Sequence, residues 1–104
     1  MLFRSEVALR TESIRPLVER VVAIQRAFAA GKGLSLVLDI APAVPETLRV
    51  DATRLAQVLN NLVHNAIKFT DTGLVRVRLA RPVAGETLFE VTDTGVGKIG
   101  RAHV

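Results

Sequence analysis

The chain has 104 residues, and its 14 Lys and Arg residues against 10 Asp and Glu residues give a formal net charge of +4. This length accommodates one small domain and is too short for two, and a hydrophobic share of 49% is enough for a real core. The absence of cysteine excludes a disulfide framework and a thiolate metal site, and the two histidines lack the further ligands of a zinc site.

Charge and hydropathy patterns narrow the possible partners. No apolar run reaches the roughly 18 residues that a membrane-spanning helix needs, and charges interrupt the apolar N-terminal stretch, so we expect no signal peptide. The arginines are scattered, without interleaved aromatic residues for base stacking. We therefore expect a segment that contacts neither nucleic acid nor membrane, although mild basicity also suits a polyphosphate ligand.

The first third of the chain predicts a short strand and a long helix. Residues 7–10 favour the strand, and "TESIRPLVERVVAIQRAFAAGKG" favours a helix that Thr11 or Ser13 can cap. Gly31 and Gly33 end this helix. Its apolar residues recur at helical spacing, and they are Ile14, Leu17, Val18, Val21, Val22 and Ile24.

Two strands and a second helix follow. The alternating stretch "LSLVLDI", residues 34–40, predicts a strand, and the prolines make residues 41–46 a loop. Residues 47–50 are expected to be a short strand or an extended lead-in to the next helix. Asp51 stands directly before "ATRLAQVLNNLVHNAIKF", where it suits the N-cap of a long helix that ends near residue 69. The apolar stripe expected to face the core consists of Leu55, Val58, Leu59, Leu62, Val63, Ala66 and Ile67.

The last predicted elements form an antiparallel hairpin. Residues 74–82 alternate apolar and basic side chains, which predicts a strand with its arginines outward. "VAGE" turns the chain into a partner strand at residues 87–93, and the glycine-rich residues 94–100 predict a loop. In all, we expect an α+β fold, a two-layer α/β sandwich with helices packed on one face of a mixed sheet.

The second helix carries an unusual polar row. Asn61, Asn65 and Lys68 lie within an arc of about 60° at helical spacing. The simpler interpretation is an ordinary polar surface, although Asn is only a middling helix former. The alternative is a ligand site, because an amide oxygen is a neutral ligand suited to Mg²⁺ and a lysine one turn on can neutralise a phosphate. Spacing alone leaves both interpretations open.

A second polar feature is "FEVTDTGVG", near the end of the chain. Asp93 stands at a strand end, and Gly95 and Gly97 follow it. Glycines allow the backbone to approach a flat ligand closely, and a carboxylate there can accept a hydrogen bond from an exocyclic amine such as that of adenine. Taken alone, the stretch also fits a plain turn after a strand.

The two features in this order resemble a known family. The pattern D-x-x-R-L-x-Q-V-L-x-N-L-x-x-N-A-I-K-F-T-x-x-G, followed some twenty residues later by D-T-G-V-G, resembles the N box and G1 box of the ATP-binding catalytic domain of sensor histidine kinases. The resemblance covers roughly residues 3–97. It implies the Bergerat nucleotide-binding fold, which DNA gyrase and MutL share, and it makes ATP and Mg²⁺ the expected ligands.

Each motif position carries an implied role. By this resemblance Asn65 coordinates the Mg²⁺ that bridges the ATP phosphates, Asn61 lines the phosphate region and Lys68 contacts a phosphate. ATPase relatives have a glutamate base where this chain has Asn61, so the amide favours phosphoryl transfer to a protein over hydrolysis. Phe69 is expected to pack near the adenine.

The G1 box supplies the rest of the expected nucleotide site. The resemblance implies that Asp93 binds the adenine amino group and that Gly95 and Gly97 lie beside the base. Catalysis would consist of positioning and electrostatics, with the acceptor histidine on a separate dimerisation domain and a response regulator downstream. His64 lacks the family's H-E-x-R-T/N-P context, so we expect it to be a flanking surface residue. Two alternatives are a degenerate module that binds a partner without nucleotide, and a serine kinase or ATPase relative.

The match to the family stops after Gly97. We expect residues 1–97 to be a partial ATP-binding domain, and "KIGRAHV", residues 98–104, to be a non-family and artefactual tail, such as a translated sequencing adapter. The family's lid and second glycine-rich motif do not follow. We therefore expect an incomplete fold, an unpaired edge on the last strand, and weak or absent ATP binding by the fragment alone.

Overall fold

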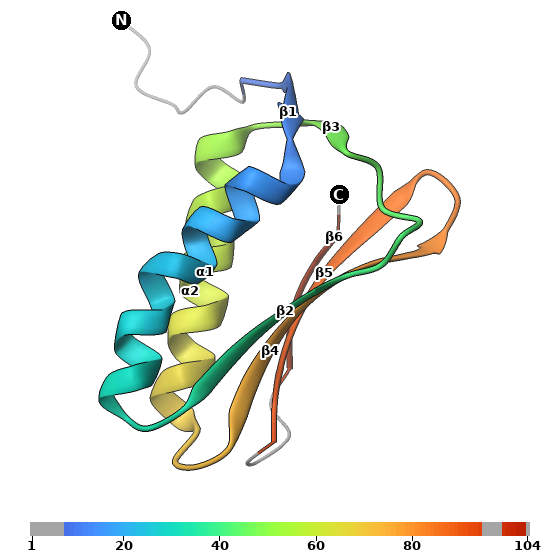
Figure 1. Ribbon diagram of the computed structural model, residues 1–104. Coiled ribbons are helices and arrows are strands. Elements are labelled where there is room, and N and C mark those ends of the chain that lie inside the picture. Colours follow the sequence, from blue (N-terminus) through green and yellow to red (C-terminus); the bar gives the residue numbers. More distant parts are fainter. Residues whose placement is uncertain (1–7, 95–98, 104) are drawn as a thin grey trace, which may run out of the picture.

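The computed structural model describes residues 8–94 and 99–103 of the chain. Figure 1 shows two helices lying side by side over one face of a twisted sheet, with a small second sheet where both helices begin. The elements in chain order are β1 (Arg10–Ser13), α1 (Ile14–Gly31), β2 (Ser35–Ile40), β3 (Thr47–Val50), α2 (Ala52–Phe69), β4 (Leu74–Val83), β5 (Glu86–Asp93) and β6 (Ile99–His103).

The larger sheet has four strands in the order β2-β4-β5-β6. β2 and β4 are parallel, whereas β4 with β5 and β5 with β6 are antiparallel. A mixed sheet covered on one face by helices confirms the predicted two-layer α+β sandwich. The smaller sheet pairs β1 with β3 antiparallel and so brings together the two segments that lead into α1 and α2.

The alternation of buried apolar and more exposed residues along β4 and β5 indicates which face of the sheet the helices cover. Val75, Val77 and Leu79 of β4 are buried, while Arg76 and Arg78 between them are exposed as predicted. On β5, Phe89 and Val91 are buried opposite Leu79 and Val77. Because successive strand side chains point to opposite faces, these five apolar residues form one surface against the helices.

The buried stripe of α2 is narrower than the sequence predicted. Leu55, Leu59, Val63 and Ile67 are buried at a spacing of four, whereas Val58 is 42% exposed, so its predicted core position is wrong. Val58 is rotated by about 100° from Leu59 and falls on the edge of the helix. Ile24 of α1 is likewise exposed, in contrast to the other apolar residues predicted for its stripe.

The first strand lies later in the chain than predicted. Residues 10–13, not 7–10, form β1, because they pair with β3 from Arg10 opposite Val50 to Ser13 opposite Thr47. Ser13 is the N-cap of α1, but its side chain makes no capping hydrogen bond. The predicted end of the helix is confirmed, since α1 stops at Gly31 and Gly33 adopts φ +73°.

The predicted loop at residues 94–100 is wrong for its last two residues. Ile99 and Gly100 begin β6, which pairs antiparallel with β5 from Thr92 opposite Ile99 to Leu88 opposite His103. The outer edge of β5 offers unsatisfied backbone groups, and this pairing occupies them, so the expected unpaired edge of β5 is also wrong. Residues 95–98 lie outside the described residues.

In the described part of the chain, no helix has the length and apolar character needed to cross a membrane.

Candidate functional site

The predicted amide row is exposed along α2. Asn61, Asn65 and Lys68 are all exposed, and they lie on the side of the helix turned away from the buried Leu59 and Val63. The structure thus brings these three side chains together on one accessible surface. Because these side chains do not fill the core, their amide and ammonium groups are accessible to a ligand.

The start of α2 is held by Asp51. Its Oδ1 accepts a hydrogen bond from the Arg54 backbone N–H at 3.1 Å, as an N-cap should, and its Oδ2 accepts one from the Ala8 N–H at 3.0 Å. The bond from Ala8, followed by that from Arg54, lowers the pKa of Asp51 below its ordinary value. Asp51 is therefore ionised at neutral pH and joins the chain before β1 to the helix that carries the amide row.

The end of α2 is closed by two side chains. The Lys32 ammonium, just after α1, donates to the carbonyls of Ile67 at 2.9 Å and Lys68 at 3.0 Å. The buried Thr70 hydroxyl donates to the Ala66 carbonyl at 2.6 Å. These bonds satisfy carbonyls that have no partner within the helix. In the same turn, the Lys68 Nζ lies 5.5 Å from the centroid of the Phe69 ring.

The flank of α2 that faces α1 carries different side chains. Gln25 Nε2 donates to Asn60 Oδ1 at 3.0 Å, and the rings of Phe28 and His64 meet edge to face. Asn60 therefore points toward α1 rather than joining Asn61 and Asn65. The contact of His64 with Phe28 fits the expectation that His64 is a flanking residue.

Asp93 ends β5 on the helix-covered side of the sheet. It lies opposite Val75 and two residues beyond Val91, both of which are buried, and its own Oδ2 atom is buried. No layer of sheet therefore separates Asp93 from α2. Gly95 and Gly97, which the sequence assigns to the same site, lie outside the described residues.

A short contact ties the turn after α2 to the end of β5. The Thr94 N–H donates to the Leu74 carbonyl at 3.1 Å, and the Leu74 N–H donates to the Thr94 hydroxyl at 3.1 Å. Gly73, with φ +101°, lets the backbone pass the Thr94 side chain. Asp93 consequently lies at the same end of the molecule as Lys68 and Phe69.

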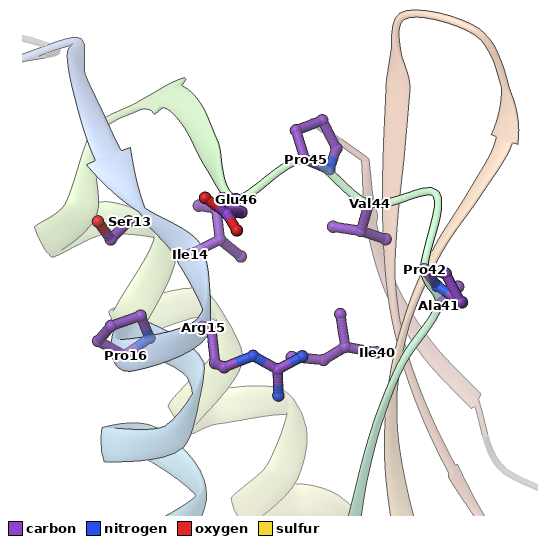
Figure 2. Close-up of a pocket in the computed structure, with 10 residues that line it drawn as sticks. All are labelled: Ser13, Ile14, Arg15, Pro16, Ile40, Ala41, Pro42, Val44, Pro45 and Glu46. Carbon is purple, nitrogen blue, oxygen red and sulfur yellow. The ribbon is translucent and has the colours of Figure 1, made fainter.

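The described residues also line two hollows, and one of them includes a residue of the predicted site. The first has a volume of about 400 Å³ and lies between the start of α1 and the loop from β2 to β3. Arg15, Ile40 and Glu46 are among the residues that line it (Figure 2). None of the predicted site residues lines it. The other hollow, of about 600 Å³, is an open one between α1 and α2, with Asn60 and Asn61 in its lining.

The sequence alone did not identify the residues that support the row. Neither Lys32, in the stretch that ends α1, nor Thr70, the threonine of the N-box pattern, was predicted to contact the last turn of α2. A lysine between two glycines at a helix end is a weak indication of such a contact, because its partner lies 35 or more residues further along the chain. Only tertiary packing reveals it.

A mixed sheet covered by two helices, with amides and a lysine exposed on the second helix, is the arrangement expected of a Bergerat-type ATPase domain. Residues 50–98 match the family model described as histidine kinase-, DNA gyrase B- and HSP90-like ATPase. The chain belongs to this family, and it corresponds to part of the ATPase domain of a histidine kinase.

Curated relatives agree with this assignment. The sensory/regulatory protein RpfC of Xanthomonas campestris pv. campestris is 39% identical over 85% of the chain and 13% of its own length. The signal transduction histidine-protein kinase BarA of Escherichia coli K12 is 34% identical over 81% of the chain and 10% of its own length. The chain therefore spans only 10–13% of the length of these relatives.

Solved structures show the same fold. Full-length ShkA, in complex with AMPPNP, superposes with a TM-score of 0.80 at 31% identity, over 88% of this chain and 19% of that one. The histidine kinase ThkA, in complex with the response regulator protein TrrA, gives a TM-score of 0.74 at 20% identity, over 86% of this chain and 26% of that one. The likeness to ThkA concerns the fold alone.

Proposed function

We propose that the chain is part of the ATP-binding catalytic domain of a two-component sensor histidine kinase. In this proposal it binds Mg-ATP for phosphoryl transfer to a histidine on a separate dimerisation domain. The observation that carries the proposal is the exposed row of Asn61, Asn65 and Lys68 on α2, with Asp93 on the helix-facing side of β5. The family match and the AMPPNP complex of ShkA support it.

The side chains of the row fit a magnesium-bound polyphosphate. Asn65 would coordinate Mg²⁺ through its amide oxygen, a hard and neutral ligand, and Asn61 would line the phosphate region. Lys68 would supply a positive point charge for a phosphate. All three are exposed and hence accessible to a ligand. Neutral amides also avoid the repulsion that carboxylates would exert on a triphosphate.

The base would lie at the end of the molecule shared by Phe69 and Asp93. Asp93 would accept a hydrogen bond from the adenine amino group, and Phe69, which is 48% exposed, would pack near the ring. Gly95 and Gly97 are proposed to lie beside the base. Because β5 ends at Asp93 on the helix-facing side, its carboxylate is directed toward the layer that contains α2.

The chemistry proposed for these residues is positioning and charge stabilisation. Bound Mg-ATP supplies the phosphoryl group and the metal charge that offsets the phosphates. Asn61, Asn65 and Lys68 would orient the phosphates toward the acceptor histidine, and a neutral Asn61 leaves no carboxylate base to activate water at that position. The site would therefore favour transfer to a protein over hydrolysis.

The wider protein context is also part of the proposal. We place the segment in the cytosol, as a domain of a membrane-anchored parent kinase, with a response regulator as the downstream partner, as the ThkA–TrrA complex illustrates for ThkA. Residues 1–97 would form the family domain and residues 98–104 a non-family, artefactual tail. The 104-residue fragment alone would bind ATP weakly or not at all.

The test compares Asn65→Ala with His64→Ala in the full-length protein that carries this segment. Calorimetric titration with Mg-ATP should show binding by the parent and by His64→Ala, and none by Asn65→Ala. Incubation with γ-labelled ATP should give acid-labile phosphohistidine in the first two proteins only. A parent that binds no Mg-ATP would favour the degenerate interaction module, and label released only as inorganic phosphate would favour an ATPase relative.

A further inference from the structure

Lys32 reaches from the end of α1 to the last turn of α2, which contains Lys68 and Phe69. We infer that Lys32 is a positioning residue: its ammonium fixes the backbone of this turn and thereby sets the Lys68 and Phe69 side chains for the nucleotide. The inference rests on the proposed function, because it concerns the same site. Lys32 belongs to neither of the two motifs that carry the family resemblance.

The contact is defined by two short hydrogen bonds. Lys32 Nζ lies 2.9 Å from the Ile67 carbonyl oxygen and 3.0 Å from the Lys68 carbonyl oxygen. The base of the side chain is itself fixed, since Lys32 is the C-cap of α1 and its N–H donates to the Ala29 carbonyl at 3.0 Å. Gly33, at φ +73°, then turns the chain into β2.

The contact acts where a helix is otherwise weakest. The last carbonyls of an α-helix lack intrahelical partners and carry the negative end of the helix dipole, so a cation there is doubly favourable. Thr70 bonds to the Ala66 carbonyl through its hydroxyl and to the Ile67 carbonyl through its N–H. Lys32 satisfies one further carbonyl at this helix end, that of Lys68.

Lys32 and Lys68 thus have separate roles at the last turn of α2. Lys32 binds the backbone at position 68, while the Lys68 ammonium lies over the Phe69 ring, 5.5 Å from its centroid. The Lys32 ammonium donates its hydrogen bonds to carbonyl oxygens of the protein. Its effect on a nucleotide therefore passes through Lys68 and Phe69.

The experiment uses Lys32→Met and Lys32→Arg in the full-length protein, with Arg26→Met as the matched control. Arg26 is on the same helix, and its Nε donates to the Leu36 carbonyl of β2 rather than to α2. We expect Lys32→Met to raise the Kd for Mg-ATP about fivefold, in line with the loss of a cation at a helix C-terminus. Lys32→Arg should restore most of the affinity, and Arg26→Met should retain it.

A double variant separates positioning from general destabilisation. If part of the Lys32 effect passes through Lys68, then Lys32→Met should weaken binding by less in the Lys68→Met background than in the parent. All titrations are made well below each variant's unfolding temperature, so a purely structural role would leave Kd unchanged. Carbonyl ¹³C shifts of Ile67 and Lys68, compared between Lys32→Met and the parent, report the contact independently of nucleotide.

The outcomes distinguish the inference from the function on which it rests. A parent that binds no Mg-ATP would overturn both. A parent that binds, with Lys32→Met binding equally well, would overturn the positioning role and leave the proposed function intact. Additive losses in the double variant would overturn the path through Lys68, and unchanged carbonyl shifts would overturn the contact itself.

Discussion

Phe28 of α1 and His64 of α2 pack edge to face, with ring centroids 5.3 Å apart and planes at 87°. Together with the Gln25–Asn60 hydrogen bond, this contact fixes which flank of α2 turns toward α1. Asn65 is rotated by about 100° from His64 and is exposed. One flank of α2 packs on α1 and its inner face packs on the sheet, so the row of Asn61, Asn65 and Lys68 faces solvent.

The proposed role of Asp93 predicts a change in base preference. Asp93→Ala in the full-length protein should weaken Mg-ATP binding and remove the preference for ATP over GTP, because the acceptor for the adenine amino group is lost. Competition of both nucleotides against a fluorescent ATP analogue measures the preference.

Asp39→Ala is the matched control for Asp93→Ala. Asp39 is an exposed carboxylate of β2 that lies opposite the exposed Arg78, on the side of the sheet away from the helices. This variant should keep both affinity and preference. If Asp93→Ala kept the same preference for ATP as the parent, its assignment to the base would be wrong.

Two valines of α2 test the orientation of the helix. Val63 is fully buried and Val58 is 42% exposed. Val63→Ala should lower the free energy of unfolding by about 2 kcal/mol, through lost apolar burial and the cavity left behind. Val58→Ala should change it by less than about 0.5 kcal/mol. Chemical denaturation of both variants measures the difference, and equal losses would contradict the observed orientation.

Asp51 predicts a pH-dependent contribution to stability. Its folded-state pKa is lowered, chiefly by the hydrogen bond from Ala8, so its contribution is present above the ordinary aspartate pKa of about 3.9. It is lost as the pH falls through the lower folded-state value. Asp51→Ala should therefore unfold at a lower temperature than the parent at pH 7, and the two should converge in more acidic solution.

The exposed Asp71, in the turn after α2, provides the control for this pH dependence. Asp71→Ala should leave the thermal midpoint near that of the parent at every pH tested. A difference between Asp51→Ala and the parent that stayed constant down to the most acidic pH would show that the ionised carboxylate is not the stabilising form.

Local patterns predicted those parts of the fold that depend on neighbours in sequence. Alternation placed Val75 and Val77 inside and Arg76 outside, and the N-cap at Asp51 fixed the start of α2. Ile24 was predicted to belong to the apolar stripe of α1 but is exposed, because apolar character alone does not indicate where a helix surface loses contact with the sheet.

Pairing between distant segments accounts for the remaining differences. The first strand was predicted too early in the chain, because its position is determined by pairing with β3. β3 pairs with residues 10–13 and lies more than 30 residues further along the chain. β6 was missed because the edge of β5 supplies the partner for a stretch with little strand character of its own. For the site, helical periodicity predicted that Asn61, Asn65 and Lys68 share one face of α2. The hydrogen bond from Lys32 to the Lys68 carbonyl could not be predicted in this way, because it arises only from the packing of α1 near α2.

Gly73 gives a final prediction about the link between α2 and the end of β5. At φ +101° an alanine is strained, and its Cβ would also overlap the Thr94 hydroxyl that accepts the Leu74 N–H. Gly85 has a similar φ of +83° but open space around the added Cβ. Both variants should lose about 1 kcal/mol to backbone strain.

Gly73→Ala should lose about 1–2 kcal/mol more than Gly85→Ala, because the overlap displaces Thr94 and breaks its bond to Leu74. Urea denaturation of the two variants measures the excess, and hydrogen exchange at the Leu74 amide reports the broken bond. Since Thr94 follows Asp93 directly, Gly73→Ala should also weaken Mg-ATP binding in the full-length protein, whereas Gly85→Ala should not. Equal losses of stability and an unchanged Leu74 amide would mean that the close approach of Gly73 to Thr94 does not hold this end of the molecule together.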